Sequence, residues 1–142
     1  MITTADAQNI LIQSCSLFGI KAFPSWATPE GRIKTERIVV VPTSPQTPAT
    51  YWEDCFIAVN LCVPDIKGKA NLQRLDELER AAKARFKEWT YGTYDESAYR
   101  YRYENIGREE DPNLGCHYVY IRVSSSRFTR LSALSQLTTA IR

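Results

Sequence analysis

The stretch Asp54–Trp89, with the sequence DCFIAVNLCVPDIKGKANLQRLDELERAAKARFKEW, decides the fold of this chain. Within it, Cys55–Val63 has apolar residues at every second position and a mixed set between them. That alternation is typical of a half-buried β-strand. Pro64 and Gly68 follow, and they indicate a turn because proline and glycine interrupt regular structure.

The second half of the stretch, Leu72–Phe86, has the spacing of an amphipathic helix. Its apolar residues recur three and four positions apart, which places them on one stripe. The opposite face carries acid-before-base pairs four residues apart, such as Asp76 with Arg80, which favour an exposed helical surface. The predicted apolar stripe consists of Leu72, Leu75, Leu78, Ala82 and Phe86. Strand and helix can therefore cover each other's apolar faces.

The segments on either side of this stretch also have recognisable patterns. Thr3, Thr4 and Asp6 are good capping residues, and the three-and-four spacing of the apolar residues after them predicts a short first helix that ends near Gly19. A non-helical connection follows, in which we expect Trp26 to plug the edge of the core. The density of β-branched residues predicts a strand over Ile33–Val41. The remaining segments are a turn over 89–97, a strand over 99–104, an acidic turn-rich segment over 105–115 and a strand over 117–123.

The order helix, strand, strand, helix, strand, strand, helix predicts an α+β fold. We expect an antiparallel sheet of about four strands with helices packed on one face. The length of 142 residues fits a single domain over residues 1–142. Leu131, Leu134 and Leu137 repeat along a polar tail, so residues 125–142 are a candidate C-terminal helical extension.

The net charge and the start of the chain exclude several classes of protein. The formal charge is only +2, which argues against a dedicated nucleic-acid binder but leaves a local positive face open. The first residues lack the pattern of a secretion signal, and no segment approaches the ~20 apolar residues that span a bilayer. We therefore expect a soluble protein in the cytoplasm with no membrane partner.

Residue types that often carry catalysis do not form a known motif here. No pair of cysteines has the short spacing of a zinc or redox site. Cys15, Cys55 and Cys62 lie in apolar surroundings, so for these three we expect small buried hydrophobes in a reducing cytoplasm and not a disulfide framework. His117 is the only histidine, and no Cys, Ser or acidic residue is placed so that it forms a recognisable nucleophilic constellation with it in sequence. The cysteines are Cys15, Cys55, Cys62 and Cys116. We expect no enzyme, no cofactor and no metal, although an enzyme assembled from scattered residues would show a concave polar pocket.

Tyrosines and arginines alternate along Tyr99–Glu104, so they lie on opposite faces of the predicted strand. In one interpretation the tyrosines pack under helices and the arginines lie exposed, where they line a lumen or meet acids of a neighbouring copy. In the alternative, a small nucleic-acid-binding module stacks bases on the tyrosines. The residues concerned are Tyr99, Tyr101 and Tyr103 on one face, and Arg100, Arg102 and Arg122 on the other.

Two segments are candidates for contact with another copy or another protein. Pro42, Pro45 and Pro48 recur at every third position, so in a polyproline II conformation they share one edge. This segment is either a docking arm or an extended exposed loop. The leucine stripe of the C-terminal tail, residues Leu131, Leu134 and Leu137, is the second candidate.

The order and length of these elements resemble the small tail-terminator and tail-completion proteins of long-tailed bacteriophages. The elements concerned are the early helix, the two strands around PTSPQTPAT, the charged helix and the following pair of strands, over about Thr4 to Val123. The tail Phe128–Arg142 departs from the shorter members of that family.

The resemblance implies a structural role in head-tail joining. It implies an α+β subunit that forms a hexameric ring at the head-proximal end of the tail tube and has no catalytic residues. Tail-tube and head-connector proteins would be its partners. Arg100, Arg102 and Arg122 would then face DNA in the lumen and make sequence-independent phosphate contacts. The protein would assemble in the host cytoplasm of a phage or prophage and end in the virion.

Overall fold

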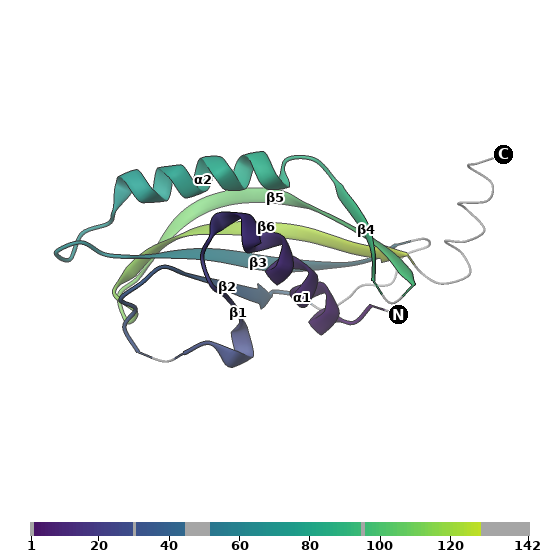
Figure 1. Ribbon diagram of the computed structural model, residues 1–142, viewed down its shortest axis with the longest axis horizontal. Coiled ribbons are helices and arrows are strands. Elements are labelled where there is room, and N and C mark those ends of the chain that lie inside the picture. Colours follow the sequence, from purple (N-terminus) through teal and green to yellow (C-terminus); the bar gives the residue numbers. More distant parts are fainter. Residues whose placement is uncertain (1, 30, 45–51, 95, 129–142) are drawn as a thin grey trace.

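The computed structural model describes residues 2–29, 31–44, 52–94 and 96–128 (Figure 1). Two α-helices, two short 3₁₀ helices and six β-strands occur in this part of the chain. The helical elements are α1 (Thr4–Ser14), η1 (Cys15–Phe18), η2 (Ser25–Ala27) and α2 (Leu72–Phe86). The strands are β1 (Ala22–Pro24), β2 (Arg37–Pro42), β3 (Trp52–Pro64), β4 (Thr90–Tyr94), β5 (Ser97–Asp111) and β6 (Cys116–Phe128).

The six strands form one mixed sheet in the order β1-β2-β3-β6-β5-β4. β1 runs parallel to β2, and all the other neighbours are antiparallel. The sheet curls into a half-barrel (Figure 1). Its three central strands are 13, 13 and 15 residues long, and twist accumulates along strands of that length. A bulge between Tyr103 and Asn105 bends β5 further.

The prediction of an antiparallel four-strand sheet with helices packed on one face is wrong. The fold is mostly sheet, with six strands, one parallel pair and two α-helices. Two strands were missed because they are short and lie at the sheet edges: β1 ends with Pro24, and β4 contains Gly92. Proline and glycine are depleted in strands, and only pairing with a neighbour overrides that local preference.

Helix α1 begins at a capping box. The Thr3 hydroxyl accepts the Asp6 N–H, and the Asp6 carboxylate accepts the Thr3 N–H. The α-helix itself ends at Ser14, and η1 continues the helical run to Gly19, whose φ of 66° is left-handed and favours glycine. The predicted end near Gly19 is therefore met by the run as a whole and not by the α-helix. The buried amide of Gln8 donates to the Val40 carbonyl and attaches α1 to β2.

The prediction of helix Leu72–Phe86 is confirmed by α2, which has these bounds. Asn71 caps it by accepting the Arg74 N–H at 3.3 Å. The first residue of the predicted stripe, Leu72, is 66% exposed, so the buried stripe begins only at Leu75. The buried residues of α2 are Leu75, Leu78, Ala82 and Phe86.

The main core lies between the two helices and one face of the sheet, here called the inner face. The prediction that alternate residues of Cys55–Val63 are buried is confirmed. α1 packs on β1, β2 and β3, whereas α2 packs on β3, β5 and β6. The strand residues that form this core include Ile38, Val40, Ile57, Val59, Leu61, Val63, Val119, Ile121 and Val123. Burial of these side chains is the main source of stability.

Three further sequence predictions need correction. Trp26 does not plug the core, because its side chain in η2 is 63% exposed. The strand predicted over Ile33–Val41 starts only at Arg37, because Ile33 packs on the opposite, outer face of the sheet. Residues 105–111 continue β5 and pair with β6, although their acidic composition is typical of a turn.

Two of the predicted contact segments lie mostly outside the described residues. Pro42 is the last residue of β2, whereas Pro45 and Pro48 fall in the part that is not described. Leu131, Leu134 and Leu137 also lie outside the described residues, as does most of the candidate helical extension. Among the helices of the described chain, none is both long and apolar enough to cross a membrane.

Candidate functional site

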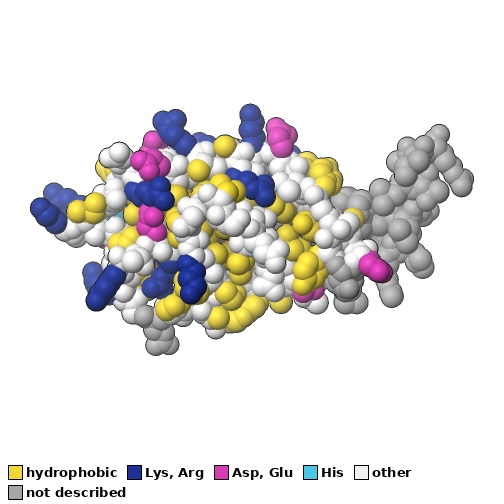
Figure 2. All heavy atoms as spheres, viewed as in Figure 1, with side chains coloured by type: hydrophobic (Ala, Val, Ile, Leu, Met, Phe, Trp, Pro, Cys, Tyr) yellow, Lys and Arg dark blue, Asp and Glu magenta, His cyan; other side chains and the backbone are white. Residues whose placement is uncertain are grey.

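The outer face of β5 and β6 brings the three predicted arginines together. Arg100 and Arg102 lie opposite Ser126 and Ser124 of β6, and Arg122 is two residues from Ser124 along the same strand. Side chains two residues apart on a strand share a face, so the three side chains form one group. On the side of the molecule that carries α1, cationic side chains also lie among acidic ones (Figure 2).

Trp89 holds the first two arginines in place. The guanidinium carbon of Arg100 lies 4.3 Å from the centroid of the Trp89 ring, and that of Arg102 lies 4.5 Å from it. Such cation–π contacts are worth about 0.5–1 kcal/mol each at exposed sites. Trp89 therefore offsets part of the repulsion between two neighbouring positive charges.

Arg122 is held by a different aromatic ring. Its guanidinium lies 4.0 Å from the centroid of the Phe56 ring on β3, and its Nε lies 3.5 Å from a Glu104 carboxylate oxygen. Glu104 stands at the bulge of β5, which gives it room to reach β6. We call Arg100, Arg102 and Arg122, with Trp89 and Phe56, the arginine–aromatic surface.

Charged neighbours border the arginine–aromatic surface. Lys87, Arg102 and Glu104 line a shallow depression together with Tyr103 and Asn105. On the other side, Asp54 of β3 accepts a hydrogen bond from the Ser126 hydroxyl at 2.5 Å. The surface is therefore positive but interrupted by carboxylates, which lower its net positive charge.

The tyrosines of β5 lie on the inner face, as one of the two sequence interpretations has it. Tyr101 is 2% exposed, and its ring stacks on that of Tyr99 with centroids 6.1 Å apart. Tyr99 and Tyr103 are half-buried against the core, and burial raises the pKa of Tyr99. A base cannot stack on Tyr101 while its ring is enclosed, so this face lacks the open platform that single-strand binding needs.

His117 ties the start of β6 to the turn that follows β3. Its Nδ1 lies 2.6 Å from an Asp65 carboxylate oxygen, and its Nε2 lies 4.0 Å from Glu110. In the described part of the chain, no three His, Cys, Asp or Glu side chains are grouped in a way that could hold a metal ion. The His117 side chain acts here as a structural tether.

The acidic run Glu109–Asp111 has structural partners as well. The Tyr118 hydroxyl donates to Glu109 at 2.6 Å, which raises the pKa of Tyr118. An Asp111 carboxylate oxygen accepts the N–H groups of Asn113 and Leu114, each at 3.1 Å. The prediction that these acids belong to a turn is wrong, because they are the last residues of β5 and pair with β6; only the Asp111 side chain reaches into the turn that follows.

The four cysteines are all buried and free. Burial raises the pKa of Cys15 to about 12, of Cys55 to about 11 and of Cys62 to about 12. The pKa of Cys116 is raised too, and again burial is the largest cause. The thiols are therefore protonated at neutral pH, as expected of small buried hydrophobes.

Sequence reasoning missed the role of Trp89. We expected it in a turn, but β4 pairs with β5 in the register Thr90 with Tyr101. One step further along the same antiparallel register puts Trp89 beside Arg102. The hairpin around Glu96 was the signal that could have shown that Trp89 lies beside Arg102. Once the position of a tight turn is known, it fixes which residues pair along the two strands that leave it.

Comparison of this chain with protein-family models, with curated proteins and with solved structures finds no match.

Proposed function

We propose that this chain is a structural protein of a phage or prophage, a tail-terminator or tail-completion subunit. In this role it self-associates into a ring at the head-proximal end of the tail and meets tail-tube and head-connector proteins. It makes sequence-independent contact with DNA. The subunits assemble in the host cytoplasm and then remain in the virion.

The arginine–aromatic surface is the observation that carries this proposal. The guanidinium groups of the three arginines lie over aromatic rings, and the planar fork of N–H donors of an arginine matches the geometry of phosphate oxygens. Arginines that contact phosphates position a nucleic acid without reading its sequence. That property suits a ring through which DNA of any sequence must pass.

The sheet offers a route to a ring. Its two edges, β1 and β4, lie at opposite ends of the strand order, so a contact between β4 of one copy and β1 of the next joins unlike surfaces. Contacts between unlike surfaces generate a ring when the rotation that relates one copy to the next returns to the first copy after a whole number of steps. Each edge carries an exposed aromatic side chain, Tyr91 on β4 and Trp26 just after β1, and these suit the contact.

Assembly of the purified full-length chain tests the proposal directly. Sedimentation velocity over about a hundredfold range of protein concentration should show a concentration-dependent shift from monomer to one closed oligomer. Electron microscopy of that oligomer should show rings with a central opening. A chain that is dimeric with two-fold symmetry at every concentration contradicts the proposed head-to-tail contact.

Loss of the gene tests the biological role. In a phage or prophage that encodes this chain, an early stop codon should leave heads and tails unjoined and tails of uncontrolled length, as seen by electron microscopy. Expression of the chain in trans should restore virions. Normal infectious particles without the chain would refute the proposal, even if the purified protein forms rings.

A further inference from the structure

The connection between β3 and α2 contains a tight turn, residues 66–69, at one end of the molecule (Figure 1). Two backbone hydrogen bonds close it: the Ile66 N–H donates to the Lys69 carbonyl at 2.8 Å, and the Lys69 N–H donates to the Ile66 carbonyl at 3.0 Å. Lys67 and Gly68 lie between them with φ angles of 53° and 76°. Two central residues with positive φ are typical of a type I′ turn. We call residues 66–69 the Lys67 turn.

Lysine is an unusual residue for the first central position of such a turn. A φ of 53° lies in the left-handed region, where side chains other than those of asparagine and aspartate are strained. Strain that is observed at a particular residue supports a hypothesis of function there. The exposed Lys67 side chain forms no ion pair within the described part of the chain, so its charge is available to a partner.

An open groove of about 630 Å³ lies beside the Lys67 turn. Its walls come from residues 34–36 before β2, from residues 63–66 at the end of β3, and from Asn71 and Arg74 at the start of α2. Arg74 joins two of these walls, because its Nε lies 2.6 Å from one Glu36 carboxylate oxygen and its Nη2 lies 3.1 Å from the other. A bidentate pair of this kind fixes the separation of the walls, so the groove is formed before a partner binds.

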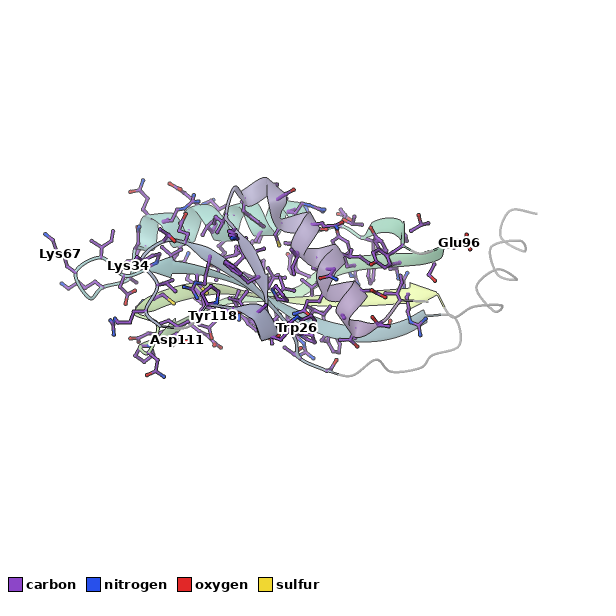
Figure 3. All side chains as sticks on the ribbon, turned by 60° about the horizontal axis from the view of Figure 1, so that its bottom comes forward. Trp26, Lys34, Lys67, Glu96, Asp111 and Tyr118 are labelled. Carbon is purple, nitrogen blue, oxygen red and sulfur yellow. The ribbon has the colours of Figure 1, made fainter. Side chains whose placement is uncertain are left out.

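Apolar and cationic side chains are exposed at this groove. Ile66, which lines it, is 55% exposed, and Leu72 at the start of α2 is 66% exposed. Lys34 lines the groove too, and it lies at the same end of the molecule as Lys67 (Figure 3). Lys69 adds a further positive charge at the Lys67 turn. Within the described residues, neither Lys34 nor Lys69 forms an ion pair.

The carboxylates that line the groove already have partners. Glu36 pairs with Arg74, and an Asp65 carboxylate oxygen lies 2.6 Å from Nδ1 of His117. The groove therefore combines exposed apolar surface with an excess of unpaired positive charge. A flat lipid surface would leave the hollow unfilled, and a phosphate backbone would leave the exposed apolar side chains without contacts. A peptide that carries both an aliphatic and acidic side chains complements the whole surface.

We propose that the groove and the Lys67 turn bind a segment of a partner protein in which acidic residues flank an aliphatic residue. The aliphatic side chain packs on Ile66 in the groove, and the acidic side chains pair with Lys34 and Lys67. The inference goes beyond the proposed function. It uses neither the arginine–aromatic surface nor the sheet edges β1 and β4, so it stands or falls independently of DNA contact and ring assembly.

Binding of a defined probe to the full-length chain tests this inference. The probe is a short fluorescein-labelled peptide in which glutamates flank a leucine, and fluorescence anisotropy follows its binding. The binding should saturate and should weaken as the salt concentration rises, because the charges lie at the surface. Replacing the glutamates by glutamine, or the leucine by serine, should weaken it by about fivefold or more. In NMR spectra the peptide should shift the amide signals of Thr35, Gly68 and Asn71.

Lys67→Asn separates binding from stability, because the two should change in opposite directions. Asparagine adopts the left-handed conformation readily, so the melting temperature should rise by about 2–4 °C. Loss of the charge should weaken peptide binding by about two- to fivefold. Lys83→Gln on α2 is the matched control, because it removes the same charge at an exposed position outside the groove and should leave binding unchanged. Ile66→Ser should weaken binding without unfolding the chain, since that side chain is exposed.

Several results would overturn the inference. One is no binding of the glutamate–leucine peptide at about millimolar protein concentration. Others are equal binding by the wild type and Lys67→Asn, or equal binding of the glutamate and glutamine peptides. Co-sedimentation with phosphatidylserine vesicles that Lys67→Asn abolishes would assign the surface to a lipid membrane instead. Displacement of the peptide by duplex DNA would assign it to nucleic acid.

Discussion

At Tyr101 a single hydroxyl joins three elements of the fold. The Ser14 hydroxyl donates to the Ile10 carbonyl at 2.9 Å, so the Tyr101 hydroxyl, 2.6 Å away, donates to Ser14. Arg85 of α2 in turn donates to the Tyr101 oxygen at 2.8 Å. One buried group of β5 thus connects α1 with α2. Buried polar groups are costly when such a partner is lost.

Replacement Tyr101→Phe should lower the free energy of unfolding by about 1–3 kcal/mol, because it removes one hydrogen bond and leaves Ser14 and Arg85 without this partner. Urea unfolding followed by circular dichroism measures the change. The matched control is Tyr91→Phe on β4, where the exposed side chain predicts a change within about 0.5 kcal/mol. Equal effects of the two replacements would contradict the role of the Tyr101 hydroxyl.

Also at the residue scale, Arg102→Ala should weaken binding to duplex DNA of any sequence. If the proposed phosphate contact exists, the slope of log K against log salt should fall by about 1. Fluorescence anisotropy at several salt concentrations measures this slope. Arg80→Ala on α2 is the control, since that side chain is 80% exposed and already paired with Asp76. If neither replacement changes the slope, Arg102 does not contact the DNA.

At the scale of elements, polar contacts fix where each helix begins and how it meets the sheet. Thr3 and Asp6 form the capping box at the N-terminus of α1, and Asn71 caps the N-terminus of α2. Arg108 of β5 reaches α2, with its Nε 3.0 Å from Glu79 and its Nη2 3.4 Å from Asp76. Exposed pairs such as these contribute little stability each, so the apolar stripe of α2 does most to hold the helix on the sheet.

The N-terminal cap of α1 should contribute measurable stability. Thr3→Ala removes the side-chain acceptor for the Asp6 N–H and should cost about 1 kcal/mol of unfolding free energy. Gln13→Ala, an exposed position in the same helix, should be neutral or slightly stabilising because alanine is the better helix former. A loss at position 13 as large as that at position 3 would argue against a capping effect.

The same cap should make stability depend on pH. The N–H of Thr3 is the main cause that lowers the pKa of Asp6 below 3.8. The ionised carboxylate therefore stabilises the folded state above the unfolded-state pKa, and this contribution disappears as the pH falls through the folded-state pKa. The stability difference between wild type and Asp6→Ala should be full at pH 6 and shrink near pH 3. Chemical unfolding at both pH values tests this, and a constant difference would contradict it.

At the scale of the whole molecule, the curl of the sheet separates two kinds of surface. The inner face is filled by α1, α2 and the core, whereas the outer face carries the arginine–aromatic surface and the small cluster around Cys62. The sheet ends at β1 on one side and at β4 on the other. The proposed ring uses these edges for its own copies and leaves the outer face for DNA.

The proposed ring also predicts a role for the C-terminal leucine stripe, residues Leu131, Leu134 and Leu137. A chain that ends at Phe128 should sediment as a smaller species than the full chain at equal concentration, because it lacks apolar side chains that a neighbouring copy would cover. The control is Ser132→Ala with Ser135→Ala, which keeps the leucines and should assemble normally. Unchanged assembly of the shortened chain would remove the stripe from the subunit contact.

Local patterns alone were enough to determine several elements of this protein. The strand around Cys55–Val63, helix Leu72–Phe86, the end of the first helical run at Gly19 and the opposite faces of the Tyr99–Glu104 strand follow from periodicity and capping. These signals involve residues that are close together in the sequence. The interactions that produce them can therefore form within one segment, without the rest of the chain.

Only the tertiary structure decided the strand number and order, the curl of the sheet and the place of Trp89 under two arginines. The short strands β1 and β4 exist because a neighbour pairs with them, against the local preference of proline and glycine. Such features depend on the register between segments far apart in the chain, and register is set by the burial of a whole face at once.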